Sequence, residues 1–198
     1  MSRISENLSR ELGPSELDHI SIIVRDLDKA IESYSSLLDV GPFSTYPPEY
    51  YRKYYSERTL RGKPANFTMK LSMAPCGPVR LELIEPVEGS SIYSEFLERK
   101  GEGLHHLGYK VKNMDATIRS FKKIGVDILM SAHGRATPTG FAYMDTEGML
   151  GFVVEIFESN QYSSNFLKHW CRWDLRLPDA KMDTAIGAQR GDSLSQTA

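Results

Sequence analysis

A stretch that occurs twice decides the fold: Asp18-His19-Ile20-Ser21-Ile22-Ile23-Val24 and His105-His106-Leu107-Gly108-Tyr109-Lys110-Val111. In both copies a histidine opens a short apolar run, and a turn with an Asp and a helical pattern follow. The copies align without a gap, because His106 lies 87 positions after His19. An internal repeat of this kind predicts two copies of one small module.

A second repeated stretch closes each copy. The run Val79-Arg80-Leu81-Glu82-Leu83-Ile84-Glu85 matches Phe152-Val153-Val154-Glu155-Ile156-Phe157-Glu158. A glutamate within an apolar strand is costly to bury unless it is paired or bound to a metal. Because both the histidine and the glutamate recur, we predict one metal site formed by His19, Glu82, His106 and Glu155. Two imidazoles and two carboxylates suit Zn, Co, Ni, Fe or Mn.

Composition narrows the class of protein. The chain has 198 residues, 40% of them hydrophobic and 25% charged, which is typical of a globular protein. A net charge of −2 predicts neither a nucleic-acid partner nor a basic membrane-binding surface. The two cysteines form no CxxC motif, and there is no apolar signal core and no apolar run long enough to span a membrane. We therefore expect a cytoplasmic protein.

Changes in pattern divide the chain into four parts. Residues 1–15 read as a flexible arm, 16–100 as a first module that ends in a linker helix, and 101–160 as a second module. Residues 161–198 form a C-terminal extension that we expect to be partly disordered. In the second module we expect strands at 105–111, 126–130, 140–145 and 151–158, a helix at 114–124, a loop at 131–139 and a turn at Glu147-Gly148.

A tyrosine-rich tract at residues 42–66 interrupts the first module. Glu155 lies only 73 positions after Glu82, so the first module holds 14 more residues than the second between its histidine and its glutamate. One interpretation is a solvated surface loop or helix. The other is a lid whose aromatics and cations cover a carboxylate- or phosphate-bearing substrate. On the second interpretation Tyr54 and Arg58 bind substrate, as does His133 from the expected loop.

These stretches resemble the vicinal oxygen chelate superfamily of glyoxalases, bleomycin-resistance proteins and dioxygenases. Within it the chain looks most like methylmalonyl-CoA epimerase. The resemblance covers residues 17–159, about three quarters of the chain, and its most specific piece is the linker from Ile92 to His106. It implies an α+β fold in which two tandem βαβββ modules form a curved mixed sheet around a metal. The resemblance also implies metal ligands at the four positions that recur in the repeat, which are His19, Glu82, His106 and Glu155. It also implies a homodimer, to which Trp170 and Trp173 could contribute.

The resemblance implies a metal-dependent isomerase or epimerase. Such an enzyme acts through a metal-stabilised enolate of a small carbonyl or acyl-CoA substrate. The candidate bases are Glu155 and Glu82, each leaving the metal transiently, and Lys70 if burial lowers its pKa. Lys70 occupies the strand position at which bacterial epimerases carry an acid/base glutamate, and it could instead bind a substrate carboxylate.

Other functions stay open at this point. A glyoxalase I-type lyase would use the same four ligands. An Fe(II) extradiol-type dioxygenase would use two histidines and one carboxylate, so Glu82 as a fourth ligand favours non-redox chemistry. A non-catalytic protein that binds a small molecule on the same fold is the third alternative.

Overall fold

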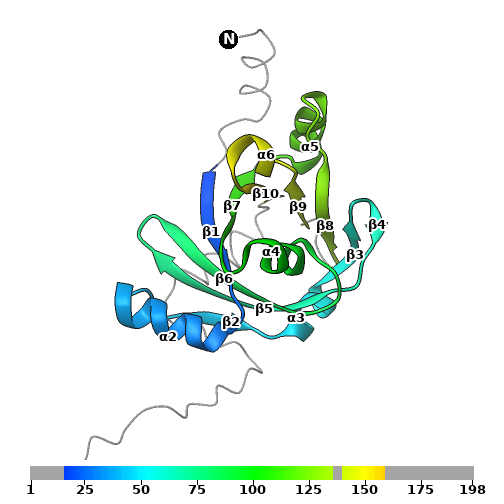
Figure 1. Ribbon diagram of the computed structural model, residues 1–198. Helices are drawn as coiled ribbons and strands as arrows, with labels where there is room; N and C mark the ends of the chain where they lie inside the picture. The colour runs from blue at the N-terminus through cyan, green and yellow to red at the C-terminus, as the bar shows by residue number, and fades with distance from the viewer. Residues whose placement is uncertain (1–15, 136–139, 159–198) are drawn as a thin grey trace, which may run out of the picture.

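The computed structural model describes residues 16–135 and 140–158, which form one curled, ten-stranded mixed sheet with five helices (Figure 1). In sheet order the strands are β2 (Ser44–Tyr46), β5 (Thr68–Cys76), β6 (Val79–Glu88), β1 (Glu16–Ile23), β7 (Gly103–Val111), β10 (Val153–Glu158), β9 (Gly140–Met144), β8 (Ile128–Gly134), β3 (Tyr55–Leu60) and β4 (Lys63–Pro64). The helices are α2 (Leu27–Leu38), α3 (Pro48–Tyr54), α4 (Ile92–Lys100), α5 (Met114–Lys123) and α6 (Glu147–Leu150).

The sheet has two halves with the same strand order. The first half runs β2-β5-β6-β1 and the second β8-β9-β10-β7, so that β1 and β7 meet antiparallel in the middle. Ile20 pairs with Leu107 there, and these two residues are 87 positions apart, which is the spacing of the sequence repeat. The predicted α+β fold with a curved mixed sheet is therefore confirmed. Two details differ, because β8 continues to Gly134 and the turn at Glu147 is a one-turn helix.

One helix covers the outer face of each half. The side chains of Asp26 and Asn113 cap the first turns of α2 and α5 by accepting hydrogen bonds from backbone N–H groups. A glutamate from the last strand of each half adds a second bond, since Glu85 accepts from the Leu27 N–H and Glu158 from the Met114 N–H. A carboxylate is favourable at this end of a helix because of the helix dipole. The second glutamate of each closing stretch is thus structural.

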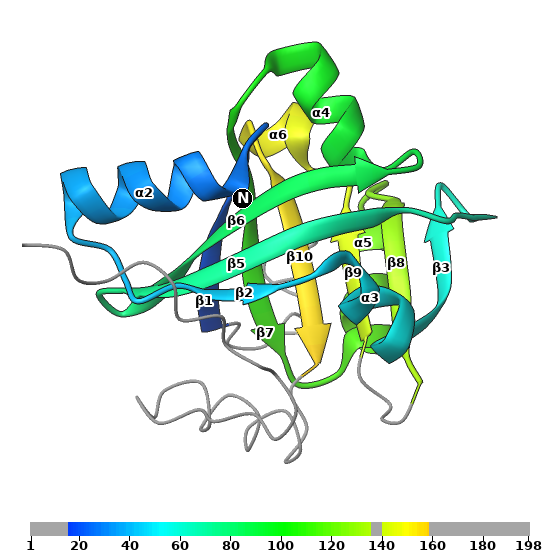
Figure 2. The same cartoon turned by 90° about the horizontal axis from the view of Figure 1, so that it is seen from below.

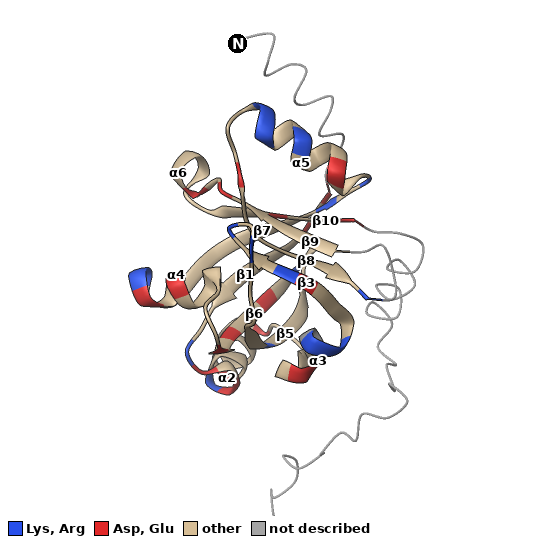
Figure 3. Cartoon of the chain, turned by 90° about the vertical axis from the view of Figure 1, so that its right-hand side faces the viewer, with Lys and Arg blue, Asp and Glu red and all other residues tan. Residues whose placement is uncertain are grey.

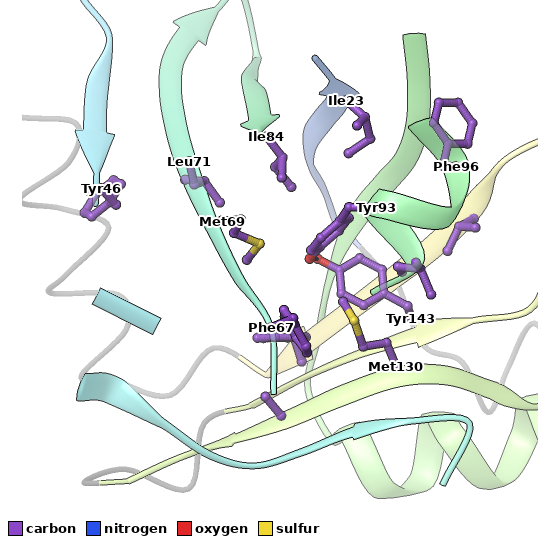
Figure 4. Close-up of a cluster of buried hydrophobic side chains, with 14 of the residues drawn as sticks. Ile23, Tyr46, Phe67, Met69, Leu71, Ile84, Tyr93, Phe96, Met130 and Tyr143 are labelled. Carbon is purple, nitrogen blue, oxygen red and sulfur yellow. Dashed lines mark hydrogen bonds between the residues drawn. The ribbon is translucent and has the colours of Figure 1, made fainter. Parts of the chain in front are cut away.

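The concave face carries the main core. Side chains from both halves and from α4 point into one cluster (Figure 4), which includes Ile23, Phe67, Met69, Ile84, Tyr93, Phe96, Met130 and Tyr143. Ser91 begins α4 with a capping box, and α4 then places Tyr93 and Phe96 in this cluster. The hydroxyl of Tyr93 donates to the hydroxyl of Tyr143 at 2.7 Å, which ties α4 to the second half.

The tyrosine-rich tract is structured and links the two ends of the sheet. It supplies β2 at one end of the strand order, and then α3, β3 and β4. Strand β3 pairs with β8 of the other half, so the short segment with α3 connects opposite ends of the sheet (Figure 2). The rings of Tyr46, Tyr50 and Tyr54 contact one another in series, the first pair edge-on and the second tilted, with centroids 4.8 and 4.5 Å apart. The tract is therefore part of the fold rather than a solvated loop.

Some expectations fall on residues that the structure does not describe. The predicted N-terminal arm and the C-terminal extension with Trp170 and Trp173 lie outside 16–135 and 140–158, and the homodimer stays a prediction. Within the described ranges, none of the helices is long and apolar enough to cross a membrane.

Candidate metal centre

The register of the central strands brings the four predicted ligands to the concave face. Ser21 of β1 lies between Glu82 of β6 and His106 of β7. In the adjacent row, Gly108 of β7 lies between His19 of β1 and Glu155 of β10. Each row therefore joins the glutamate of one half to the histidine of the other. Strand pairing fixes these positions, so the site depends on both halves.

The four ligand atoms converge. The Nε2 atoms of His19 and His106 are 3.4 Å apart. Glu155 Oε2 lies 2.8 Å from His19 Nε2 and 3.3 Å from His106 Nε2. Glu82 Oε2 lies 3.2 Å from His106 Nε2 and 3.7 Å from His19 Nε2. All four residues are buried, with exposed fractions of 0–7%.

These distances and the surroundings fit a divalent ion. Ligands bound about 2.0–2.2 Å from one ion lie roughly 2.8–3.6 Å from each other, which is close to the distances of the two Nε2 atoms from each other and from the carboxylate oxygens. Within the described residues, His19, Glu82 and His106 form one compact group of possible ligands, and Glu155 lies against both histidines. Within the described residues, Glu82 Oε2 is buried and approaches His106 Nε2 at 3.2 Å without a well-formed hydrogen bond, as expected of an atom that a cation would satisfy. Gly108 leaves the space that the His19 ring occupies, because a methyl group there would overlap the ring. His19, Glu82, His106 and Glu155 could therefore hold a metal.

His19 is supported by a carboxylate. The β1–β7 pairing is irregular between Leu17 and His19, and Asp18 lies at this irregularity. Its Oδ2 lies 2.9 Å from His19 Nδ1, and the same oxygen accepts from the Arg80 guanidinium. Donation from Nδ1 to Asp18 would leave the lone pair of a neutral His19 on Nε2, toward the other candidate ligands, as metal binding requires.

His106 is supported by a second imidazole. The pairing is irregular again between Ser21 and Ile22, and the residue opposite this break is His105. The Nδ1 atoms of His105 and His106 are 2.9 Å apart. Burial, and then the charge of His106, hold the pKa of His105 well below its usual value, so His105 is neutral and accepts the bond. His105 is thus placed to orient His106, and the repeat alignment predicts His106 rather than His105 as the ligand.

The ligands shift each other's pKa strongly. Burial alone would lower the pKa of His19, but Glu82, Asp18 and Glu155 raise it to about 10. Burial also opposes the charged form of His106, but Glu155 and Glu82 raise its pKa. Burial would raise the pKa of Glu155, but its bonds with His106 and His19 hold that pKa well below the usual range. The metal-free site therefore holds protons where a metal would bind.

Aromatic residues that the site prediction did not include surround the ligands. Phe157 stacks on the His19 ring at a centroid distance of 5.8 Å, and Tyr143 lies edge-on to His106 at 5.0 Å. Burial, Glu155 and Glu82 raise the pKa of Tyr55 to about 12, so this phenol from the tyrosine-rich tract stays protonated beside the carboxylates. Alternation along the second closing stretch could have shown Phe157, which is two residues from Glu155.

Lys70 does not reach the site, which corrects the sequence-based assignment. Strand β5 alternates, with Met69 and Leu71 in the concave core and Lys70 on the outer face. The Lys70 ammonium lies 2.9 Å from Glu85 Oε1, and this bond raises its pKa. Because that carboxylate also receives the first N–H of α2, Lys70 helps to fix a helix. The prediction that burial lowers the pKa of Lys70 is wrong.

The three predicted substrate-binding residues lie in different places. His133 is exposed on β8, and its neighbours Met130 and Ala132 occupy the opposite, concave face, so the structure does not bring His133 to the site. Tyr54 ends α3 and is 44% exposed at the outer end of the tyrosine stack. Arg58 lies over the ring of the buried Phe67, with its Cζ 5.5 Å from the centroid. Arg58 thus contacts a buried side chain of the concave core.

Comparison with known proteins gives one consistent family. A family model described as the Glyoxalase/Bleomycin resistance protein/Dioxygenase superfamily matches residues 18–143. The uncharacterized protein YqjC of Bacillus subtilis is 25% identical over 149 residues, covering 73% of this chain and 92% of that protein. Human mitochondrial methylmalonyl-CoA epimerase is 26% identical over 147 residues, covering 71% and 72%.

Solved structures show the same fold. The crystal structure of methylmalonyl-CoA epimerase from Mycobacterium tuberculosis aligns with a TM-score of 0.53 at 24% identity, covering 75% of this chain and 91% of that one. A methylmalonyl-CoA epimerase in complex with methylmalonyl-CoA aligns with the same TM-score at 22% identity, covering 74% and 96%. At these identities the likeness establishes the fold alone.

Proposed function

Because this chain belongs to the Glyoxalase/Bleomycin resistance protein/Dioxygenase superfamily, we propose that it is a metal-dependent isomerase that moves a proton next to a carbonyl group. The proposed substrate class is an acyl-CoA thioester or a similar small carbonyl compound, as the names of several relatives indicate. The proposed cofactor is one of the divalent ions Zn, Co, Ni, Fe or Mn.

The approach of carboxylate oxygens to both imidazole nitrogens carries this proposal, since Glu82 Oε2 and Glu155 Oε2 each lie 2.8–3.7 Å from the Nε2 atoms of His19 and His106. A divalent ion held there would polarise the substrate carbonyl and make the neighbouring C–H more acidic. Two carboxylates balance the charge of such an ion. Four protein ligands favour isomerase or lyase chemistry over an Fe(II) oxygenase, which uses two histidines and one carboxylate.

The two carboxylates are the candidates for proton transfer. Glu155 is bonded to both histidines, which favours its ionised form, whereas Glu82 Oε2 makes no hydrogen bond. Either glutamate could accept the substrate proton, because both lie where the carbonyl would bind. Tyr55 stays protonated beside them and is suited to donate a hydrogen bond rather than to act as a base. Phe157 and Tyr143 give the two histidines aromatic neighbours.

Deuterium exchange tests this function. Metal-loaded protein is incubated with methylmalonyl-CoA in D2O, and NMR follows deuterium at the acidic carbon. We expect metal-dependent exchange that is lost in His106→Ala. Exchange should also be lost in Glu82→Gln or in Glu155→Gln, and the variant that loses it identifies the glutamate that acts as the base. Lys112→Gln, a change at an exposed position outside the site, serves as the control. Absence of exchange in wild-type protein that has bound its metal would refute the epimerase-type function.

A further inference from the structure

A cluster of arginines lies where the tyrosine-rich tract meets β8. Arg52 belongs to α3, Arg58 to β3, and Arg135 follows the end of β8. Segments coloured for Lys and Arg are visible at α3 and β3 in Figure 3. Arg135 lies against the end of α3, because its backbone N–H donates to the Tyr54 carbonyl at 2.9 Å and its Nε donates to the Arg52 carbonyl. Arg52 and Arg135 both lie close enough to Arg58 for their charges to act on it.

A strained bulge turns Arg58 toward the concave core. In the β3–β8 pairing Ser56 lies opposite His133 and Thr59 opposite Ser131, so Glu57 and Arg58 together face one residue. Glu57 has a φ of 48°, in the left-handed region that is unfavourable for a non-glycine residue. The extra residue reverses the alternation, and Arg58 then faces the same side as Tyr55. Bulges that re-aim a side chain are common next to functional sites.

The positive charge of Arg58 is fixed but not neutralised. Its guanidinium donates to the Phe67 carbonyl at 2.6 Å and to Asn66 Oδ1 at 2.9 Å, and both acceptors are neutral. A guanidinium has five N–H donors, and within the part of the chain that the structure describes Arg58 uses two of them in these bonds. Burial and the nearby charges of Arg52 and Arg135 lower its pKa. Such repulsion is relieved when an anion binds between the charges.

The other two arginines leave the cluster positive as well. Among the described residues, the Arg135 guanidinium donates from Nε to the Arg52 carbonyl, which leaves its two terminal amino groups to bind an anion. The carboxylate that contacts the cluster within the described residues is Glu88, in an exposed pair with Arg52 at 2.7 Å. Exposed pairs of this kind exchange readily with solvent and with other anions.

We propose that Arg58 and Arg135, with Arg52 beside them, bind the anionic group of the substrate that lies away from the reacting carbonyl. This inference rests on the proposed function and deepens it. The Arg58 guanidinium lies over Phe67, Phe67 packs on Tyr93 with centroids 6.3 Å apart, and Tyr93 lies 6.5 Å from His106. The anion site is thus joined to the metal centre by a run of aromatic rings. Its ligand is a phosphate or a carboxylate, since a guanidinium recognises both.

Binding calorimetry on the metal-loaded full chain tests the proposal with two probes. Adenosine 3′,5′-bisphosphate represents a phosphate-bearing substrate end, and succinate represents a carboxylate end. We expect Arg58→Gln and Arg135→Gln each to weaken binding of one probe by about 10- to 100-fold, as for the loss of a charge-assisted hydrogen bond. The probe whose affinity falls shows whether the site binds a phosphate or a carboxylate. Arg119→Gln, which removes an exposed arginine from α5, should leave both affinities unchanged.

Unchanged affinity for both probes in Arg58→Gln and Arg135→Gln, with normal circular dichroism, would overturn the proposal. An equal loss in Arg119→Gln would also overturn it, because the effect would then be one of net charge. The result is independent of the isomerase function, since neither probe reacts. If a probe depends on Arg58 while wild-type protein exchanges no deuterium, the anion site stands and the proposed reaction fails.

Discussion

In the first half of the metal centre, His19 is bonded to the Asp18 carboxylate, which Arg80 holds in turn. In the second half, the neutral His105 takes the place of Asp18 beside His106. Both supports lie at an irregularity of the same strand pair, 87 positions apart. The backbone thus repeats the position of the support while the sequence changes its charge. A carboxylate makes its histidine a stronger ligand than a neutral acceptor does.

The residues between the ligands differ in a second way. Gly108 lies between His19 and Glu155, and Ser21 lies at the equivalent place between His106 and Glu82. A side chain fits at Ser21, whose hydroxyl is buried without a hydrogen-bond partner, but not at Gly108. Strand register therefore determines where the candidate ligands lie, whereas the neighbouring residues determine how each ligand can bind.

The largest effect is expected from Gly108→Ala. The added methyl group would overlap the His19 ring and displace it, so metal affinity should fall by more than the ~100-fold upper range of outer-shell changes. Ser21→Gly makes the two rows alike and should change metal affinity by less than about threefold, as expected of a residue that holds no ligand. Calorimetric metal titration measures both. Equal losses in the two variants would contradict the asymmetry.

Removing the supports should weaken the two halves unequally. We expect Asp18→Asn to lower metal affinity about 10- to 100-fold, and His105→Phe to lower it less, since the group lost there is neutral. Asp115→Asn, at an exposed position on α5, is the matched control. If His105→Phe proved the more damaging change, the carboxylate would not be the stronger support.

Raising the pH should lower the stability of the metal-free protein and raise its apparent affinity for metal. In metal-free protein the raised pKa of His19, about 10, stabilises the fold fully below its ordinary value of 6.5, and this stability is lost as pH rises toward 10. Metal must displace that proton, so apparent metal affinity should rise about tenfold per pH unit below pH 10. Thermal unfolding and metal titration from pH 6 to 9 measure the two trends. Affinity that is independent of pH would show that His19 gives up no proton.

The smallest effect is expected from Lys70→Gln. Its ion pair with Glu85 is partly exposed, so the free energy of unfolding should fall by about 1 kcal/mol or less. Metal affinity and deuterium exchange should not change, because Lys70 lies on the outer face. Chemical denaturation and the exchange assay check this. Loss of exchange with intact metal binding would restore Lys70 as a catalytic residue.

The repeat made much of this architecture predictable. A period of 87 residues and the two closing glutamates were enough to indicate paired modules and four candidate ligands, because register follows directly from aligned strands. The path of the tyrosine-rich tract was not predictable, since pairing of β3 with β8 is a long-range contact without a local signal. Lys70 was misplaced because one residue along a strand reverses the face. His133 was misplaced because β8 is longer than expected.

We propose that both halves of the sheet together bind one metal ion, and the amount of metal bound per chain tests this. Wild-type protein, His19→Ala and His106→Ala are dialysed against a limiting concentration of zinc, and bound metal is measured per folded chain. The account predicts one ion per wild-type chain and almost none in either variant. Full occupancy in either variant would contradict a shared site, because one half would then be sufficient to hold the metal.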